Sequence, residues 1–212
     1  MVTLETSSLI SMHIDLFPQR VYKYHLDPTE IKKFMLERYN SYKDFSVNGT
    51  PDGWFCNVRT EFQGAFPQEI SDNYLGILNQ WKSDIGLSHR PYIHEIWMNS
   101  YDRSHYQEPH THLPGFYSAI HYVMFDPYEH EGTTFCNPQE QINSFMFDGE
   151  FMDERLNPHI LEHADIPVEE GDILIFPSNL KHFVKKNDSK HLRMTISFNI
   201  NRVAENTRRV FA

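Results

Sequence analysis

The stretch HLRMTISFNIN, residues 191–201, decides the class of fold. Its apolar positions alternate without exception with polar ones, Leu192, Met194, Ile196, Phe198 and Ile200 against Arg193, Thr195, Ser197, Asn199 and Asn201. This period of two is that of a β-strand with two different faces. Either the polar face meets water, or both faces are buried and the polar one lines a cavity where Arg193 binds a carboxylate. Periodicity alone leaves both interpretations open.

The same period recurs from Pro91 onward, whereas the chain before it is helical in pattern. Asp27-Pro28-Thr29-Glu30 is a start signal for a helix that runs to about Tyr42. Apolar residues three or four apart predict a second helix over residues 70–85, with Gly86 at its end. Strands are predicted over residues 92–101, 116–125, 133–136, 173–176, 182–184 and 191–201. Helices followed by short strands predict an α+β fold in which the helices support a β-sandwich or barrel.

Length and composition limit the remaining possibilities. A chain of 212 residues predicts one domain, with N-terminal support over 1–90, a β core over 91–201 and an acidic insertion, a solvated loop or lid, over 137–165. A net charge of −10 without a basic run argues against a nucleic-acid partner. The absence of a long apolar stretch or signal peptide predicts a cytoplasmic protein with no membrane partner. Cys56 and Cys136 are too few for a disulfide framework and are expected to be reduced thiols.

Histidine is the unusual residue of this chain. There are 13, and five lie within the 26 residues from His105 to His130. Histidine is the commonest metal ligand. On a strand, His110 and His112 would point to the same face about 7 Å apart and could converge on one ion. A histidine from a neighbouring strand, such as His182, could complete a set of three.

Four blocks of sequence carry a family resemblance. They are His110-x-His112, SAIHY at 118–122, GDxLxFPSxLxHxV at 171–184 and RxTISFN at 193–199. In this order they resemble the iron(II)- and 2-oxoglutarate-dependent oxygenases, and more narrowly a prolyl-hydroxylase-like branch common in marine bacteria and phages. The resemblance covers residues 91–201, and Ala119 stands where that branch usually has Gly.

The resemblance implies both a fold and a site. The fold would be a double-stranded β-helix, a jelly-roll or cupin-like core. Fe(II) would be bound by His110, His112 and His182, and the far carboxylate of 2-oxoglutarate by Arg193 with help from Thr195 and Tyr122. Dioxygen would be the other co-substrate, and the enzyme would hydroxylate a C–H bond of a peptide or small molecule. The acidic insertion favours a neutral or cationic substrate.

One ligand departs from the superfamily pattern of two histidines and a carboxylate. His112 stands where most members have Asp or Glu, so the site is one charge unit more positive, which disfavours oxygen activation unless a neighbouring carboxylate compensates. Glu108 and Glu131 are the candidates for this carboxylate. Glu108 is also an alternative to His112 as the third ligand, but Pro109, between Glu108 and His110, argues against a regular strand geometry for that pair.

Two other classes of function remain open. Three histidines could hold Zn²⁺ in a hydrolase or hydratase, or bind metal inertly in a non-enzymatic cupin-like module. Arg193 argues against the zinc enzyme, because a hydrolase or hydratase does not need a guanidinium on this strand. Consumption of 2-oxoglutarate would distinguish the oxygenase from the inert module.

Overall fold

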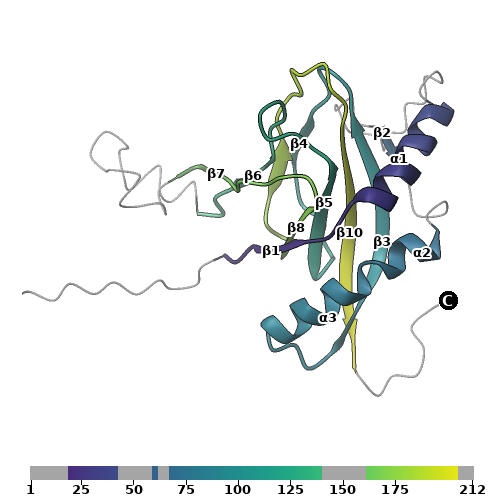
Figure 1. The fold of residues 1–212 in the computed structure, drawn as a ribbon. Helices are drawn as coiled ribbons and strands as arrows, with labels where there is room; N and C mark the ends of the chain where they lie inside the picture. Colours follow the sequence, from purple (N-terminus) through teal and green to yellow (C-terminus); the bar gives the residue numbers. More distant parts are fainter. Residues whose placement is uncertain (1–18, 43–58, 62–66, 140–160, 205–212) are drawn as a thin grey trace, which may run out of the picture.

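The computed structural model describes residues 19–42, 59–61, 67–139 and 161–204. Two antiparallel sheets face one another, and helices lie on the outer side of the larger sheet (Figure 1). The larger sheet has the order β1-β8-β5-β10-β3-β2 and the smaller one β4-β9-β6-β7. This arrangement confirms the predicted α+β class, with helices supporting a two-sheet core.

From β3 onward the two sheets draw their strands alternately from the chain, because β4, β6, β7 and β9 of the smaller sheet come between strands of the larger one. The larger sheet contains β1 (Tyr22–His25), β2 (Arg59–Glu61), β3 (Arg90–Tyr101), β5 (Tyr117–Met124), β8 (Asp172–Pro177) and β10 (Arg193–Val203). The smaller sheet contains β4 (Gln107–His110), β6 (Thr133–Cys136), β7 (His163–Asp165) and β9 (His182–Val184). The helices are α1 (Thr29–Tyr42), α2 (Gln68–Asp72) and α3 (Leu75–Asp84).

Capping and hydrogen bonding by nearby residues set the ends of the helices. Asp27 Oδ1 accepts hydrogen bonds from the backbone N (3.0 Å) and the hydroxyl (2.7 Å) of Thr29, which caps α1 as predicted. The single helix predicted over residues 70–85 is wrong, because the chain breaks into α2 and α3 at Asn73 and Tyr74. Both of these backbone N–H groups bond to the carbonyl three residues earlier. Gly86, with φ of +65°, follows the end of α3.

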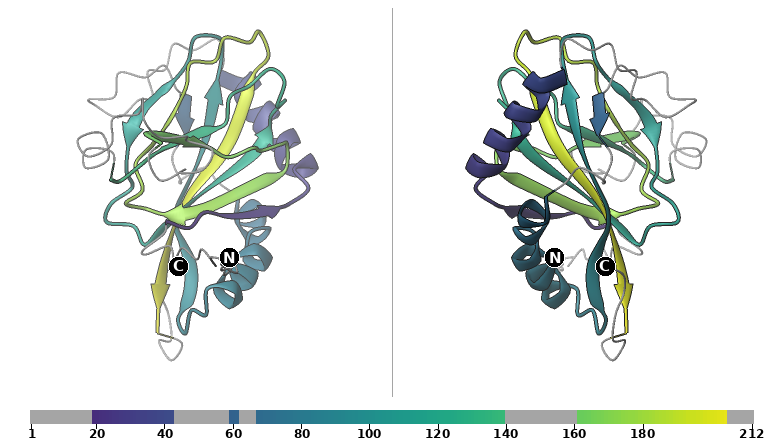
Figure 2. Two further views of the ribbon diagram at one scale, coloured as in Figure 1. Left: turned by 90° about the vertical axis from the view of Figure 1, so that its left-hand side faces the viewer. Right: turned by 90° about the vertical axis from the view of Figure 1, so that its right-hand side faces the viewer.

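The strand β10 is buried on both faces. Every residue from Arg193 to Ile200 is buried, as the second interpretation of the alternation expected. Its apolar face joins a core with β3, β5, β8 and the helices, including Met35, Leu78 and Trp81. The other side of the larger sheet packs on the smaller sheet through a second cluster that includes Tyr122 and Phe176. Figure 2 shows the helices on one side of the larger sheet and the smaller sheet on the other.

Several local features were not predicted. The strands β1, β2, β4 and β7 were missed, and β7 lies within the segment interpreted as an acidic insertion. Residues 140–160 of that segment and Cys56 lie outside the described residues. Cys136 is a buried free thiol, in agreement with the prediction. Among the described residues, no helix has the length and apolar character needed to span a membrane.

Candidate metal centre

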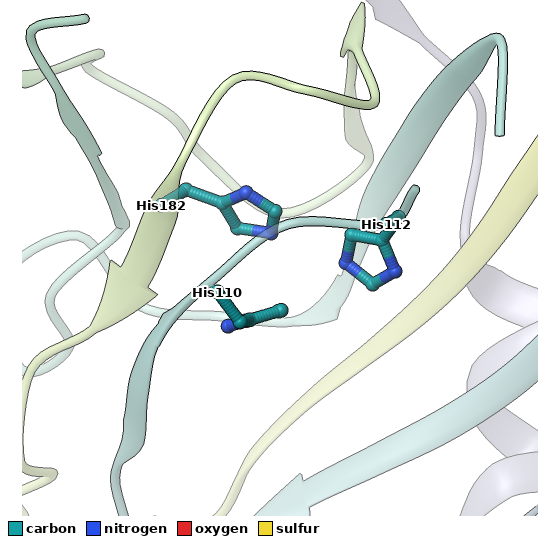
Figure 3. Close-up of side chains that lie close together, drawn as sticks. All are labelled: His110, His112 and His182. Atoms are coloured by element: carbon teal, nitrogen blue, oxygen red, sulfur yellow. The ribbon is translucent and has the colours of Figure 1, made fainter. Parts of the chain in front are cut away.

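Three histidines meet at one end of the smaller sheet. His110 ends β4 and is paired in register with His182, which begins β9. His112 lies two residues beyond β4, and one ligand atom from each residue lies within 4.8 Å of the others. Figure 3 shows the three rings turned toward a common region. These are the three histidines that the sequence selected.

A loop, and not a strand, places His112. The expectation that His110 and His112 share a strand face is wrong, because β4 ends at His110. The backbone N of His112 donates to the carbonyl of Ser178 (2.9 Å), and the N of Gly115 donates to the carbonyl of His112 (2.8 Å). A Cβ built on Gly115 would lie 2.7 Å from Ser178 Oγ, so the lack of a side chain there permits this close packing.

Backbone carbonyls orient two of the imidazoles. His110 Nδ1 lies 2.7 Å from the carbonyl of Glu108, and His182 Nδ1 lies 3.0 Å from that of Leu180. A carbonyl oxygen only accepts, so each Nδ1 carries the hydrogen and Nε2 presents the lone pair. Such a bond on the second nitrogen is the usual way in which a metal-binding histidine is fixed.

The environment keeps these imidazoles neutral. Burial lowers the pKa of His112 and of His182 to about 3, with the neighbouring histidines adding to the effect. Burial also lowers the pKa of His110, although the carbonyl of Glu108 opposes this shift. Since a proton and a metal compete for the same lone pair, the group is ready to bind a metal at neutral pH.

The described residues place no carboxylate in this group. The side chain of Glu108 is exposed, and its part in the site is the backbone carbonyl that receives His110. Glu131 lies 3.5 Å from Lys185 in an exposed ion pair. The donor set is therefore three neutral imidazoles, which suits a divalent transition metal.

Arg193 is the second unusual feature of the interior. It is 2% exposed, and its guanidinium lies 4.4 Å from the ring centroid of Tyr101 and 5.6 Å from that of Tyr122. Among the described residues, none is a hydrogen-bond partner of its three guanidinium nitrogens. A buried cation without an anion is costly. The site therefore fits an anionic ligand.

The other predicted ligand-binding residues surround this arginine. Thr195, 1% exposed, follows it on the same strand face, and its Oγ1 accepts from Asn99 Nδ2 at 3.4 Å. The hydroxyl of Tyr122 lies 2.9 Å from Thr133 Oγ1 and accepts the N–H of Thr133 at 3.1 Å. Burial raises the pKa of Tyr122, so the phenol stays protonated.

Aromatic packing connects the histidines to the arginine. The ring of His182 lies 4.8 Å from that of Phe176 and 6.0 Å from that of Phe135. Both phenylalanines belong to the same buried cluster as Tyr122, over which Arg193 stacks. The three-histidine group and the guanidinium are thus parts of one interior between the two sheets.

Residues 95–199 match the family described as "Putative 2OG-Fe(II) oxygenase". The chain belongs to this family. Its cofactors are therefore Fe(II) and 2-oxoglutarate, as predicted, and the enzyme is a 2-oxoglutarate-dependent oxygenase. Family membership favours this activity over the zinc hydrolase and the inert cupin-like module. Among curated proteins, none matches the sequence.

Solved structures show the same fold. A Pseudomonas putida prolyl-4-hydroxylase is 13% identical with a TM-score of 0.56, over 87% of this chain and 94% of that one. A Trichoplax adhaerens prolyl hydroxylase in complex with a peptide is 14% identical (TM-score 0.55; 87% and 84%). Streptomyces hygroscopicus HygX with nickel and 2-oxoglutarate is 10% identical, with a TM-score of 0.53 over 86% of this chain and 82% of that one. These likenesses confirm the predicted double-stranded β-helix of the oxygenase.

The sequence did not reveal two neighbours of the site. The ring of Trp97 lies 5.3 Å from that of His112, and Asn99 Nδ2 donates to Thr195 and to Ser197 (3.0 Å). The only signal for them was the period of two over residues 92–101, which does not say which face is inside.

Proposed function

We propose that this oxygenase hydroxylates a C–H bond of a peptide or small molecule. In this proposal His110, His112 and His182 hold Fe(II), while Arg193, Thr195 and Tyr122 hold 2-oxoglutarate. The observation that carries the proposal is the buried guanidinium, which has no hydrogen-bond partner within the described ranges of the chain, in the same interior as three neutral imidazoles. A dicarboxylic acid that binds metal at one end has a second carboxylate with which to neutralise this arginine.

When bound, Fe(II) and 2-oxoglutarate together supply the oxidising chemistry, in which dioxygen is consumed, 2-oxoglutarate yields succinate and carbon dioxide, and a substrate C–H becomes C–OH. The protein supplies binding, orientation and exclusion of water. Arg193 can donate two parallel hydrogen bonds to a carboxylate. Thr195 accepts from Asn99, so its own hydroxyl hydrogen can go to the same carboxylate.

The surroundings of the site keep it dry. Phe135 and Phe176, both buried, pack on His182, and Tyr101 packs on the guanidinium. Removing water strengthens each charge interaction in the interior. The resemblance in fold to prolyl hydroxylases, one of them in complex with a peptide, supports a peptide substrate.

The test is an anaerobic titration of the Fe(II) protein with 2-oxoglutarate, followed by assay of succinate in air. We expect one iron per chain, a weak visible absorption band on binding and succinate formation. His182→Ala should lose iron, band and turnover. His89→Ala, a histidine that precedes β3 and lies outside the three-histidine group, should keep all three. Full iron and 2-oxoglutarate binding by His182→Ala would contradict the proposal.

A further inference from the structure

A row of polar side chains leads from Arg193 past the metal centre to an exposed carboxylate. On β3, Asn99 bonds to Thr195 and Ser197, and Trp97 packs on His112. Two residues further along the same face is Glu95, whose Oε2 accepts from Asn199 Nδ2 at 2.8 Å. One strand repeat of two residues is about 7 Å. Glu95 therefore stands about one side-chain length from the residue that contacts His112.

A directed chain of hydrogen bonds holds this carboxylate. A carboxylate only accepts, so the amide of Asn199 must turn its nitrogen toward Glu95 and its oxygen toward Ser118. Ser118 Oγ donates to Asn199 Oδ1 (2.9 Å), and Ser178 Oγ, 2.8 Å from Ser118 Oγ, then donates to Ser118. The carbonyl of Ser178 receives the backbone N–H of His112. Glu95 and the metal centre thus share one set of supports.

The supports are buried, but the carboxylate is not. Asn199 is 6% exposed, Ser118 1% and Ser178 0%, whereas Glu95 is exposed. A glutamate that only adds surface charge needs no buried amide to fix it. A buried hydrogen-bond network therefore reaches the surface at Glu95.

The strand β3 changes immediately beyond this residue. Glu95 pairs with Asn199, but Ile93 pairs with Ile200, so His94 is an extra residue in β3. Such a bulge redirects the side chains beyond it. Followed from Asn99 toward the N-terminus, the inner face of β3 carries Asn99, Trp97 and finally Glu95, and the bulge comes next.

Within the described part of the chain, no cationic side chain is within ion-pair distance of Glu95. Resting on the proposed function, we propose that Glu95 selects the substrate by binding a cationic group on it, an ammonium or a guanidinium. The spacing fits a lysine- or arginine-like chain whose reacting carbon lies at the metal centre. The same charge could be carried by a peptide side chain or by a free alkylamine, and the net charge of −10 would attract either.

The test uses matched probes with the full-length Fe(II) protein and 2-oxoglutarate. The peptides are capped pentapeptides, Ac-Gly-Ala-X-Ala-Gly-NH₂, with X as Lys, Arg, norleucine or Glu, and the free amine is n-hexylamine. Anaerobic binding of each probe and of 2-oxoglutarate is measured for wild type, Glu95→Gln and Glu95→Lys. Glu37→Gln is the control, since it removes the same charge from an exposed position on α1.

We expect wild type and Glu37→Gln to bind the Lys or Arg peptide, or the amine, at least tenfold more tightly than the norleucine peptide. Glu95→Gln should lose this preference, and Glu95→Lys should favour the Glu peptide. All four proteins should bind 2-oxoglutarate alike. Preference for the amine over the peptides would identify a small-molecule substrate. Equal binding of cationic and neutral probes by wild type, or an unchanged preference in Glu95→Gln, would overturn the inference. Failure of wild type to bind 2-oxoglutarate would instead refute the proposed function beneath it.

Discussion

Replacing Arg193 by Met should have opposite effects on ligand binding and on the stability of the ligand-free protein. The guanidinium is 2% exposed, and its nitrogens have no hydrogen-bond partner among the described residues. Loss of one member of a buried charge pair costs about 2 to 5 kcal/mol. At about 1.4 kcal/mol per tenfold, 2-oxoglutarate should bind about 30-fold to several thousand-fold more weakly.

In the ligand-free protein, the same substitution should increase the stability of the fold. The unpaired guanidinium opposes folding, whereas a methionine can keep the contact with Tyr101, so the variant should be more stable by about 1 to 4 kcal/mol. Thermal melting with and without 2-oxoglutarate and anaerobic calorimetry measure both effects, and metal content should not change. Arg202→Met is the control, because this exposed arginine lies on the same strand, 3.7 Å above the ring of Phe116. The reasoning is refuted if Arg193→Met binds 2-oxoglutarate within about threefold of wild type.

Three further predictions concern the metal ligands, the buried His121 and the glycine beside His112. His112→Asp should retain iron and change the rate of succinate formation, because it restores an anionic ligand, whereas His182→Ala should lose iron; equal rates in His112→Asp and wild type would argue against His112 as a ligand. Burial lowers the pKa of His121 to about 4 in the folded protein. Between pH of about 6.5 and 4 only the unfolded chain takes up this proton, so the folded protein should lose stability as the pH falls through this range. Melting temperature should therefore depend less on pH in His121→Asn, and an unchanged slope would contradict this. Gly115→Ala should destabilise the protein by about 1 to 3 kcal/mol and weaken metal binding, since its Cβ would meet a serine hydroxyl at 2.7 Å. Gly76→Ala on α3, with nothing within 4 Å, should be neutral or stabilising, and the opposite order of stabilities would be inconsistent with the structure.

The sequence predicted the parts of the fold that depend on local pattern. The alternation in β10 and the cap at Asp27 are confirmed because both are encoded within a few neighbouring residues. The sequence-based prediction failed where the pairing of distant strands determines the structure. The strand β4 contains Pro109, which argues against a strand, but β4 is at the edge of its sheet, where a missing N–H is tolerated.

The sequence indicated which residues to group in the candidate site, and their roles stay predictions, but it did not indicate their geometry. The spacing of two residues indicated His110 and His112, and the family resemblance implied His182 as the third ligand, yet their approach depends on the pairing of β4 with β9 and on the contact of His112 with Ser178. Alternation could not show whether Arg193 faces water, because a strand buried on both faces has the same pattern as one buried on one face. Glu95 was missed since its partner, Asn199, is 104 residues away.

The division of the site between the two sheets has a thermodynamic consequence. The histidines are held by β4, β9 and the loop after β4, whereas Arg193, Thr195 and Tyr122 belong to β10 and β5 of the other sheet. Metal alone would contact only the histidines, whereas a dicarboxylate bound to the metal at one end and to Arg193 at the other would connect the two layers. Each ligand therefore gains a contact when the other is present. Metal and dicarboxylate should then each raise the affinity of the protein for the other by the same factor, because such coupling is reciprocal.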